Sequence, residues 1–162
     1  MRILIAAAGR GRGTPEEELC ENYLARAKAM GRKLGFAGAA LDAVDVSRAA
    51  SAKARMMEEA GRLKRKIPPG ARRIALDRRG KPATSEEFAQ RLAKWRDAGT
   101  RDLVFLIGGP DGLAGELRDA ADERLAFGPQ TWPHLLVRAM LAEQIYRAFS
   151  ILAGHPYHRG AP

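Results

Sequence analysis

The chain has 162 residues, of which 46% are hydrophobic and 29% charged, and its formal net charge is +9. This length predicts one domain over residues 1–162, and the excess of positive charge favours a polyanionic partner such as nucleic acid. The single cysteine, Cys20, excludes an internal disulfide and a zinc site built from cysteines, and a small core residue is its expected role. No apolar run is long enough to span a bilayer, so we expect a cytoplasmic protein without a membrane partner.

The first strand-like segment, residues 3–8, ends in glycines at positions 9, 11 and 13. Their G-x-G-x-G spacing differs from the dinucleotide-binding fingerprint, which favours a flexible basic loop over a nucleotide cofactor site. Thr14 and Pro15 then predict a helix start. The helix should carry a core-facing stripe, formed by Leu19, Tyr23, Ala27 and Met30.

The rest of the chain alternates between strand and helix patterns. We expect strands at residues 40–46, 73–77, 102–107 and 124–127, and helices at residues 51–66, 84–97, 113–122 and 135–152. This alternation predicts an α/β fold with a parallel sheet and helices on both faces. The basic helix at 51–66 fits a solvated face better than an RNA contact surface.

The last helix is apolar nearly all round, with a narrow polar arc of Arg138, Gln144 and Arg147. A helix of this kind is buried on most sides. In so short a chain, that pattern predicts cover from a partner subunit.

Three of the predicted strand ends carry unusual residues: Leu76-Asp77, the glycine turn at 108–112, and the loop at 127–132. Ligands of open parallel sheets bind outside the carboxyl ends of strands. Gly108 and Gly109 leave room for a ligand to approach the backbone, although an ordinary strand-to-helix turn has the same composition.

All three histidines lie near the end of the chain, at positions 134, 155 and 158. Their spacing fits no common metal site, so no metal is expected. The tail His155-Pro156-Tyr157-His158-Arg159 mixes groups that stack on bases and grip phosphates. A frayed terminus without a function is the alternative.

Several ordered motifs in the chain match one protein family. They are Ile107-Gly108-Gly109-Pro110-Asp111-Gly112, Thr131-Trp132-Pro133-His134, Val137-Arg138, Glu143-Gln144-Ile145-Tyr146-Arg147-Ala148 and the tail at 155–159. With these motifs the chain resembles the RlmH family, bacterial methyltransferases of the SPOUT superfamily that act on ribosomal RNA of the large subunit. The resemblance is dense over the last sixty residues or so and thin over the first seventy or so.

The resemblance implies a SPOUT-type fold with a C-terminal trefoil knot, and a homodimer that uses S-adenosyl-L-methionine. It also implies methylation of N3 of a pseudouridine in 23S rRNA, in the helix 69 region of the assembled ribosome. The cofactor residues that it implies are Leu76, Gly108, Gly109, Phe127, Gly128, Pro129, Gln130, Thr131 and Trp132. Many relatives have serine in place of Gly128 and glutamate in place of Asp111.

N3 of the target carries a proton, so its methylation needs a base or a pre-ionised base edge. The candidate catalytic residues are His134, Arg138 and His158, with His134 as the first candidate base. The candidate RNA-binding residues are Arg138, His155, Tyr157, His158 and Arg159. Glu143 and Arg147 have the spacing of a helix ion pair.

Two other functions fit parts of the sequence. A non-catalytic protein that binds the ribosome would explain the charge and the tail but not the glycine turn and the 127–132 loop. A dinucleotide-dependent enzyme would rest on Gly9, Gly11 and Gly13 alone.

Overall fold

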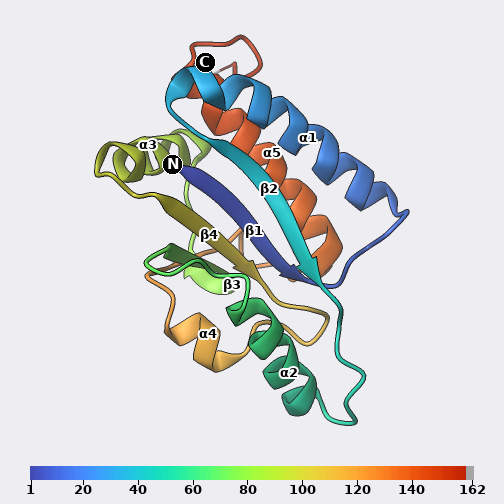
Figure 1. Cartoon of the computed structure of the whole chain (residues 1–162). Helices are drawn as coiled ribbons and strands as arrows, with labels where there is room; N and C mark the ends of the chain where they lie inside the picture. Colours follow the sequence, from blue (N-terminus) through green and yellow to red (C-terminus); the bar gives the residue numbers. More distant parts are fainter. Residues whose placement is uncertain (160–162) are drawn as a thin grey trace.

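The structure, a computed structural model, describes residues 1–159, and the last three residues of the predicted domain lie outside that range. A five-stranded sheet forms its centre, in the order β2-β1-β4-β3-β5 (Figure 1). The strands are β1 (Arg2–Ala8), β2 (Gly38–Val44), β3 (Arg72–Lys81), β4 (Asp102–Ile107) and β5 (Glu123–Leu125). All neighbouring strands are parallel, which confirms the predicted sheet.

Helices cover both faces of the sheet. They are α1 (Pro15–Gly31), the short 3-10 helix η1 (Arg32–Leu34), α2 (Ala52–Lys64), α3 (Ser85–Asp97), α4 (Gly115–Asp119) and α5 (His134–Leu152). α1, α3 and α5 pack in one apolar cluster, and α2 and α4 pack in another on the opposite face. Within residues 1–159, no helix has the length and apolar character needed to cross a membrane.

Side chains of the central strands alternate between these two clusters. Ile3, Ile5 and Ala7 of β1 point toward α1, α3 and α5, whereas Ala6 and Ala8 point toward α2 and α4. Successive side chains of a strand point to opposite faces, so a strand covered on both faces must be apolar throughout. β4 follows the same rule, because every one of its residues is buried.

A threonine caps each of the helices α1 and α3. The hydroxyl oxygen of Thr84 accepts from the N–H of Glu87 at 3.1 Å, and the Glu87 carboxylate accepts from the N–H of Thr84 at 2.9 Å. Thr14 accepts from the N–H of Glu17 at 3.3 Å, but the Glu17 carboxylate bonds to the N–H of Gly13 instead. α3 therefore begins with a complete capping box and α1 with a simple cap.

Three predictions about single elements were wrong. β3 runs on to Lys81, beyond the predicted end at residue 77, because Lys81 and Leu76 both pair with Leu125 of β5. α4 spans five residues instead of the ten predicted. Leu19, predicted as core, is 46% exposed, because it lies at the rim of a groove between helices instead of inside the cluster.

Most of the apolar surface of α5 is buried by other elements of the same chain. The prediction that a partner subunit is needed to bury this helix was therefore too strong. It packs against α1, where Gly31 leaves room for the ring of Phe149, and against α3. Arg138, predicted on the polar arc, is only 3% exposed. Leu135, Leu136 and Met140 near the start of the helix remain partly exposed.

Candidate cofactor and RNA site

The three unusual strand ends meet around one cavity of about 400 Å³, which we call the strand-end cavity. It lies at the carboxyl ends of β3, β4 and β5, where open parallel sheets bind ligands. Of the residues predicted to bind a cofactor, its walls include Leu76, Gly108, Gly109, Phe127, Gly128, Gln130, Thr131 and Trp132. Pro129 is not among the lining residues. The volume falls in the range of small-molecule sites.

The glycine turn after β4 is filled by the protein itself. A Cβ atom on Gly108 would lie 2.2 Å from the carbonyl carbon of Gly112, and one on Gly109 would lie 2.7 Å from Oε2 of Glu59. Both distances are far below contact distance, so Gly108 is needed where the backbone of the turn closes on itself and Gly109 lets the carboxylate of Glu59 pack against the turn. Both residues also line the cavity, and close approach of a ligand to their backbone stays a prediction.

An ion pair fixes the turn to α2. Nε of Arg55 donates to Oδ2 of Asp111 at 2.6 Å, and its Nη2 donates to Oδ1 at 3.0 Å. Nη1 of Arg55 also donates to the carbonyl of Ala49 at 3.1 Å. The hydrogen bonds from Arg55 lower the pKa of Asp111. The sequence offered no sign of this contact, because the two residues are 56 positions apart.

The loop at 127–132 forms the opposite wall. Nε1 of Trp132 donates to the carbonyl of Phe127 at 3.0 Å, which closes the loop on itself, and Gly128 adopts a φ of 88°. Within the described part of the chain, no backbone N–H of this loop donates to a protein acceptor. These N–H groups are available to a ligand, which suits a loop expected to bind through its backbone.

A charged wall, whose Asp77 stands at one of the three strand ends singled out in the sequence, completes the cavity. Asp77 follows the buried part of β3 and accepts from the N–H of Arg79 at 2.8 Å. Nε of Arg118 lies 3.8 Å from Oδ2 of Asp77. Burial raises the pKa of Asp77, but these hydrogen bonds and cations outweigh it, so the net shift is downward. A polar residue at a predicted strand end was the only available signal.

His134 and Arg138 lie together beside the cavity, one turn apart on α5. A Cβ on Gly9 would lie 2.8 Å from Nε2 of His134, and one on Gly11 would lie 3.5 Å from Nη2 of Arg138. The glycine loop after β1 is therefore packed against the protein's own side chains, which argues against a dinucleotide there. Burial, and then the charge of Arg138, lower the pKa of His134, so its imidazole is neutral at neutral pH.

Arg138 is a buried cation without good partners. Its Nη1 donates to the carbonyl of Arg10 at 3.4 Å, while Nε and Nη2 have no partner in the described chain. Burial lowers its pKa. Because the side chain is enclosed, the expectation that Arg138 contacts RNA conflicts with this conformation.

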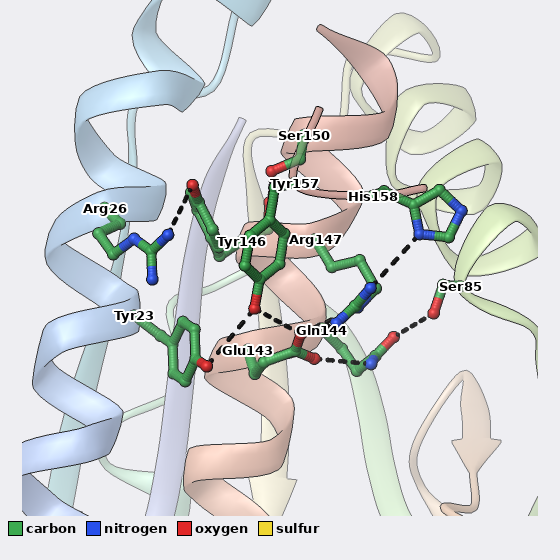
Figure 2. Close-up of polar contacts among 10 residues, drawn as sticks. All are labelled: Tyr23, Arg26, Ser85, Glu143, Gln144, Tyr146, Arg147, Ser150, Tyr157 and His158. Carbon is green, nitrogen blue, oxygen red and sulfur yellow. Dashed lines mark hydrogen bonds and ion pairs between the residues drawn. The ribbon is translucent and has the colours of Figure 1, made fainter. Parts of the chain in front are cut away.

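The tail folds back on the middle of α5 instead of reaching the strand-end cavity of its own chain (Figure 2). The hydroxyl of Tyr157 donates to Oε1 of Glu143 at 3.0 Å, and Nε2 of His158 lies 2.8 Å from Oε1 of Glu86. Burial, with help from Tyr23 and Glu143, raises the pKa of Tyr157.

The predicted helix ion pair between Glu143 and Arg147 is present, with Nε of Arg147 2.9 Å from Oε1. Nη1 of Arg147 lies 3.4 Å from Nδ1 of His158. His134 lies more than three turns away, roughly 20 Å along the helix axis. One chain therefore does not bring the three candidate catalytic residues together.

The remaining tail residues are accessible. His155 and Arg159 are exposed, whereas Tyr157 and His158 are partly covered.

Within residues 1–159, no cluster of three or more histidine, cysteine or acidic residues has the arrangement of a metal site.

Comparison with known proteins gives a consistent result. The family description "Predicted SPOUT methyltransferase" matches residues 1–158. "Ribosomal RNA large subunit methyltransferase H" of Hyphomonas neptunium is 52% identical over 98% of this chain and 99% of its own length. The proteins of that name from Rhodopseudomonas palustris and Nitrobacter hamburgensis are 51% and 50% identical, over 98% and 99% of this chain and 99% and 100% of their own lengths.

Among solved structures, a putative methyltransferase of Legionella pneumophila in complex with SAM is similar with a TM-score of 0.48 and 11% identity. The match covers 94% of this chain and 66% of the other, and it is too distant to bear on the site. The sequence relatives, in contrast, are close and match from end to end. The chain belongs to the SPOUT methyltransferase family, in the group of ribosomal RNA large subunit methyltransferases H.

Proposed function

We propose that this protein uses S-adenosyl-L-methionine to methylate N3 of a pseudouridine of 23S rRNA, in the helix 69 region of the assembled ribosome. The activity itself follows the close relatives, whose name gives ribosomal RNA of the large subunit as their substrate. The exact nucleotide rests on the family resemblance. One structural observation carries the proposal: three strand-end segments that are far apart in sequence enclose the strand-end cavity.

The cavity suits the proposed cofactor. Leu76, Leu113 and Val137 give it apolar walls, and the 127–132 loop adds backbone N–H groups that have no acceptor within residues 1–159. Such a mixture of apolar surface and a few polar groups is typical of cofactor sites. When bound, the sulfonium supplies an activated methyl group, and the protein has to position N3 against it.

His134 is the residue best placed to take the N3 proton. It lines the cavity, and its lowered pKa keeps the imidazole neutral and able to accept a proton. With the cofactor bound, the sulfonium would supply the methyl group and leave as a neutral thioether, and the imidazole of His134 would accept the proton that N3 loses. Arg138 lies one turn further along α5, and its charge lowers the pKa of His134, which keeps the imidazole unprotonated before the reaction.

We propose that the protein is a homodimer in which the tail of one chain completes the cavity of the other. An apolar groove between α1, α3 and α5, with a volume of about 590 Å³, includes Leu19, Phe127, Leu136 and Met140. Leu19 is 46% exposed and Leu136 and Met140 are partly exposed, and apolar surface gathered at a groove is typical of a contact surface. A two-fold partner is the commonest occupant, and it would supply the tail that the chain's own cavity lacks.

The proposed trefoil knot has support near β5. Leu76 and Lys81 both pair with Leu125, and the N–H of Ala126 donates to the carbonyl of Lys81 at 3.2 Å. A Cβ on Gly80 would lie 2.7 Å from the carbonyl carbon of Leu125. Residues 76–81 thus wrap tightly round β5 just before the chain enters the 127–132 loop. In the proposed knot, residues 126–134 pass through the loop that residues 76–101 form. An experimental structure in which they pass outside that loop would contradict the knot.

The proposed activity is tested with purified ribosomes from a strain that lacks the modification. We expect the protein to transfer a labelled methyl group to 23S rRNA, and mass spectrometry to place it on N3 of a pseudouridine in helix 69. Thr131→Trp fills the cavity from an exposed position, so it should abolish cofactor binding in calorimetry without unfolding the chain. Cofactor binding without any transfer to rRNA would refute the proposed substrate. Binding of ribosomes without cofactor binding would favour the non-catalytic alternative.

A further inference from the structure

Most arginines around the strand-end cavity are neutralised by carboxylates. Arg55 pairs with Asp111, Arg79 with Asp77, and Arg118 with Asp119. In residues 1–159, Arg78 is the arginine on the cavity wall without such a partner. A cation held in a pair contributes little to the field that a polyanion meets. The net charge of +9 must therefore come mainly from other parts of the surface.

The opposite, amino-terminal edge of the sheet carries a group of cations that we call the amino-edge patch. Its members are exposed and form no ion pair with any described residue: Lys28, Arg32, Lys33, Lys94 and Arg101. Asp97 and Asp102, at the two ends of the turn from α3 to β4, are already paired with Arg96 and Arg2. The patch therefore has one sign of charge and no local compensation.

Backbone contacts hold the two segments of this patch together. Nη1 of Arg96 donates to the carbonyl of Leu34 at 2.7 Å, which ties the end of α3 to η1. The N–H of Arg2 donates to the carbonyl of Arg101 at 2.8 Å, and the N–H of Ala37 donates to that of Met1. The end of α1, η1 and the turn from α3 to β4 thus meet at one edge, in the upper part of Figure 1.

We propose that the amino-edge patch binds the phosphate backbone of ribosomal RNA, as a second contact remote from the strand-end cavity. The inference rests on the proposed function for its partner, RNA. Clustered cations without carboxylates repel one another in the free protein, and a row of phosphates neutralises them. The same contacts release the counterions that had condensed on the RNA, which favours binding.

The patch also remains available in the proposed homodimer. None of its side chains lines the apolar groove between α1, α3 and α5. The tail begins near the same edge, because Ser150 at the end of α5 contacts Met30 at the end of α1. A tail that reaches the partner's cavity would place the patch of one subunit beside the active site of the other. RNA bound at that cavity would then continue across the patch.

The test compares three double variants that each remove two positive charges. Arg32→Gln with Lys33→Gln, and Lys94→Gln with Arg101→Gln, change the two segments of the patch. Lys53→Gln with Arg65→Gln is the matched control, since both residues are exposed cations on or beside α2 and outside the patch. Binding to purified ribosomes and to a short RNA duplex of arbitrary sequence is measured over a series of salt concentrations. Cofactor affinity by calorimetry checks that each variant is folded.

We expect both patch variants to bind ribosomes and duplex roughly tenfold or more weakly at ~0.1 M salt. The slope of log affinity against log salt should become shallower by about 0.7 to 0.9 for each phosphate that the variant no longer neutralises. The control should change much less. An equal loss of affinity in the control would mean that only total charge matters, and would overturn the proposal. Weaker binding to ribosomes with unchanged binding to duplex would point to a ribosomal protein as the partner and would equally overturn it.

Failure of this inference can be told apart from failure of the proposed function. If the unaltered protein methylates ribosomes and the patch variants bind as well as the control, the function stands and the patch is refuted. If the unaltered protein transfers no methyl group while the patch variants still lose RNA affinity selectively, the patch stands and the function is refuted.

Discussion

Arg55 and Asp111 join α2 to the glycine turn through two hydrogen bonds, of 2.6 and 3.0 Å. The turn forms part of the cavity wall, and Asp111 itself lines the cavity. The shape of the proposed cofactor site therefore depends on α2, which holds the turn through Arg55 and also contributes Met56 to the cavity wall.

Asp111→Asn should weaken S-adenosyl-L-methionine binding several-fold, because the amide keeps the size of the side chain but loses the charge that holds Arg55. Isothermal titration calorimetry measures the effect. Glu116→Gln is the control. It removes a carboxylate of α4 that pairs with Lys64 of α2 outside the cavity, and it should leave the affinity unchanged. Equal affinities of Asp111→Asn and the unaltered protein would show that the ion pair does not shape the site.

The pH dependence of methyl transfer should report His134. Burial and Arg138 lower its pKa, so the neutral form persists below the ordinary value of about 6.5 and kcat/KM should fall only at lower pH. Arg138→Met removes a cation, which raises the pKa of His134 and moves the acidic limb to higher pH. The titration of His134 by NMR should shift in the same direction.

His155 and His158 serve as internal controls in these NMR spectra, since neither lies beside Arg138. Nε and Nη2 of Arg138 have no partner among residues 1–159, so its replacement by methionine of similar length should cost little stability. An acidic limb that stays in place while the NMR pKa of His134 shifts would mean that another group takes the proton.

Thr84→Ala should lower the free energy of unfolding by about 1 kcal/mol, because it removes one half of the capping box of α3. For a chain of this size, the melting temperature should fall by about 2–4 °C. Ser51→Ala is the comparison, since Ser51 caps α2 with a single bond to the N–H of Ala54 and no reciprocal bond. Ser51→Ala should therefore cost less stability than Thr84→Ala. A larger loss of unfolding free energy at Ser51 than at Thr84 would contradict this order.

Mixed dimers test whether the tail acts on the other subunit. Thr131→Trp disables the cavity, and a chain without residues 155–162 lacks the tail. Each homodimer should be inactive. If sites are shared, the mixed dimer contains one intact cavity served by one intact tail, and part of the methyl transfer activity should return. Mixed dimers verified by native mass spectrometry that remain inactive would show that each chain relies on its own tail.

Local sequence patterns determined the architecture. The apolar strands, the threonine caps and the alternation of strand and helix specified a parallel sheet with helices on both faces, because these signals depend on neighbouring residues. The position of the strand-end cavity followed as well, since the carboxyl ends of parallel strands lie at one edge of the sheet. The family membership was also legible, through motifs in the last third of the chain.

The tertiary structure decided what each site residue touches. Arg138 has the helical position of a surface residue, but α1 and the glycine loop enclose it. Gly108 and Gly109 serve the packing of their own turn, and Arg55 reaches Asp111 across 56 residues. His158 lies far from His134 because the tail packs beside Arg147, in the carboxyl-terminal half of α5, whereas His134 begins the helix. Such contacts join residues distant in sequence, so their geometry depends on how whole elements pack, which no local pattern encodes.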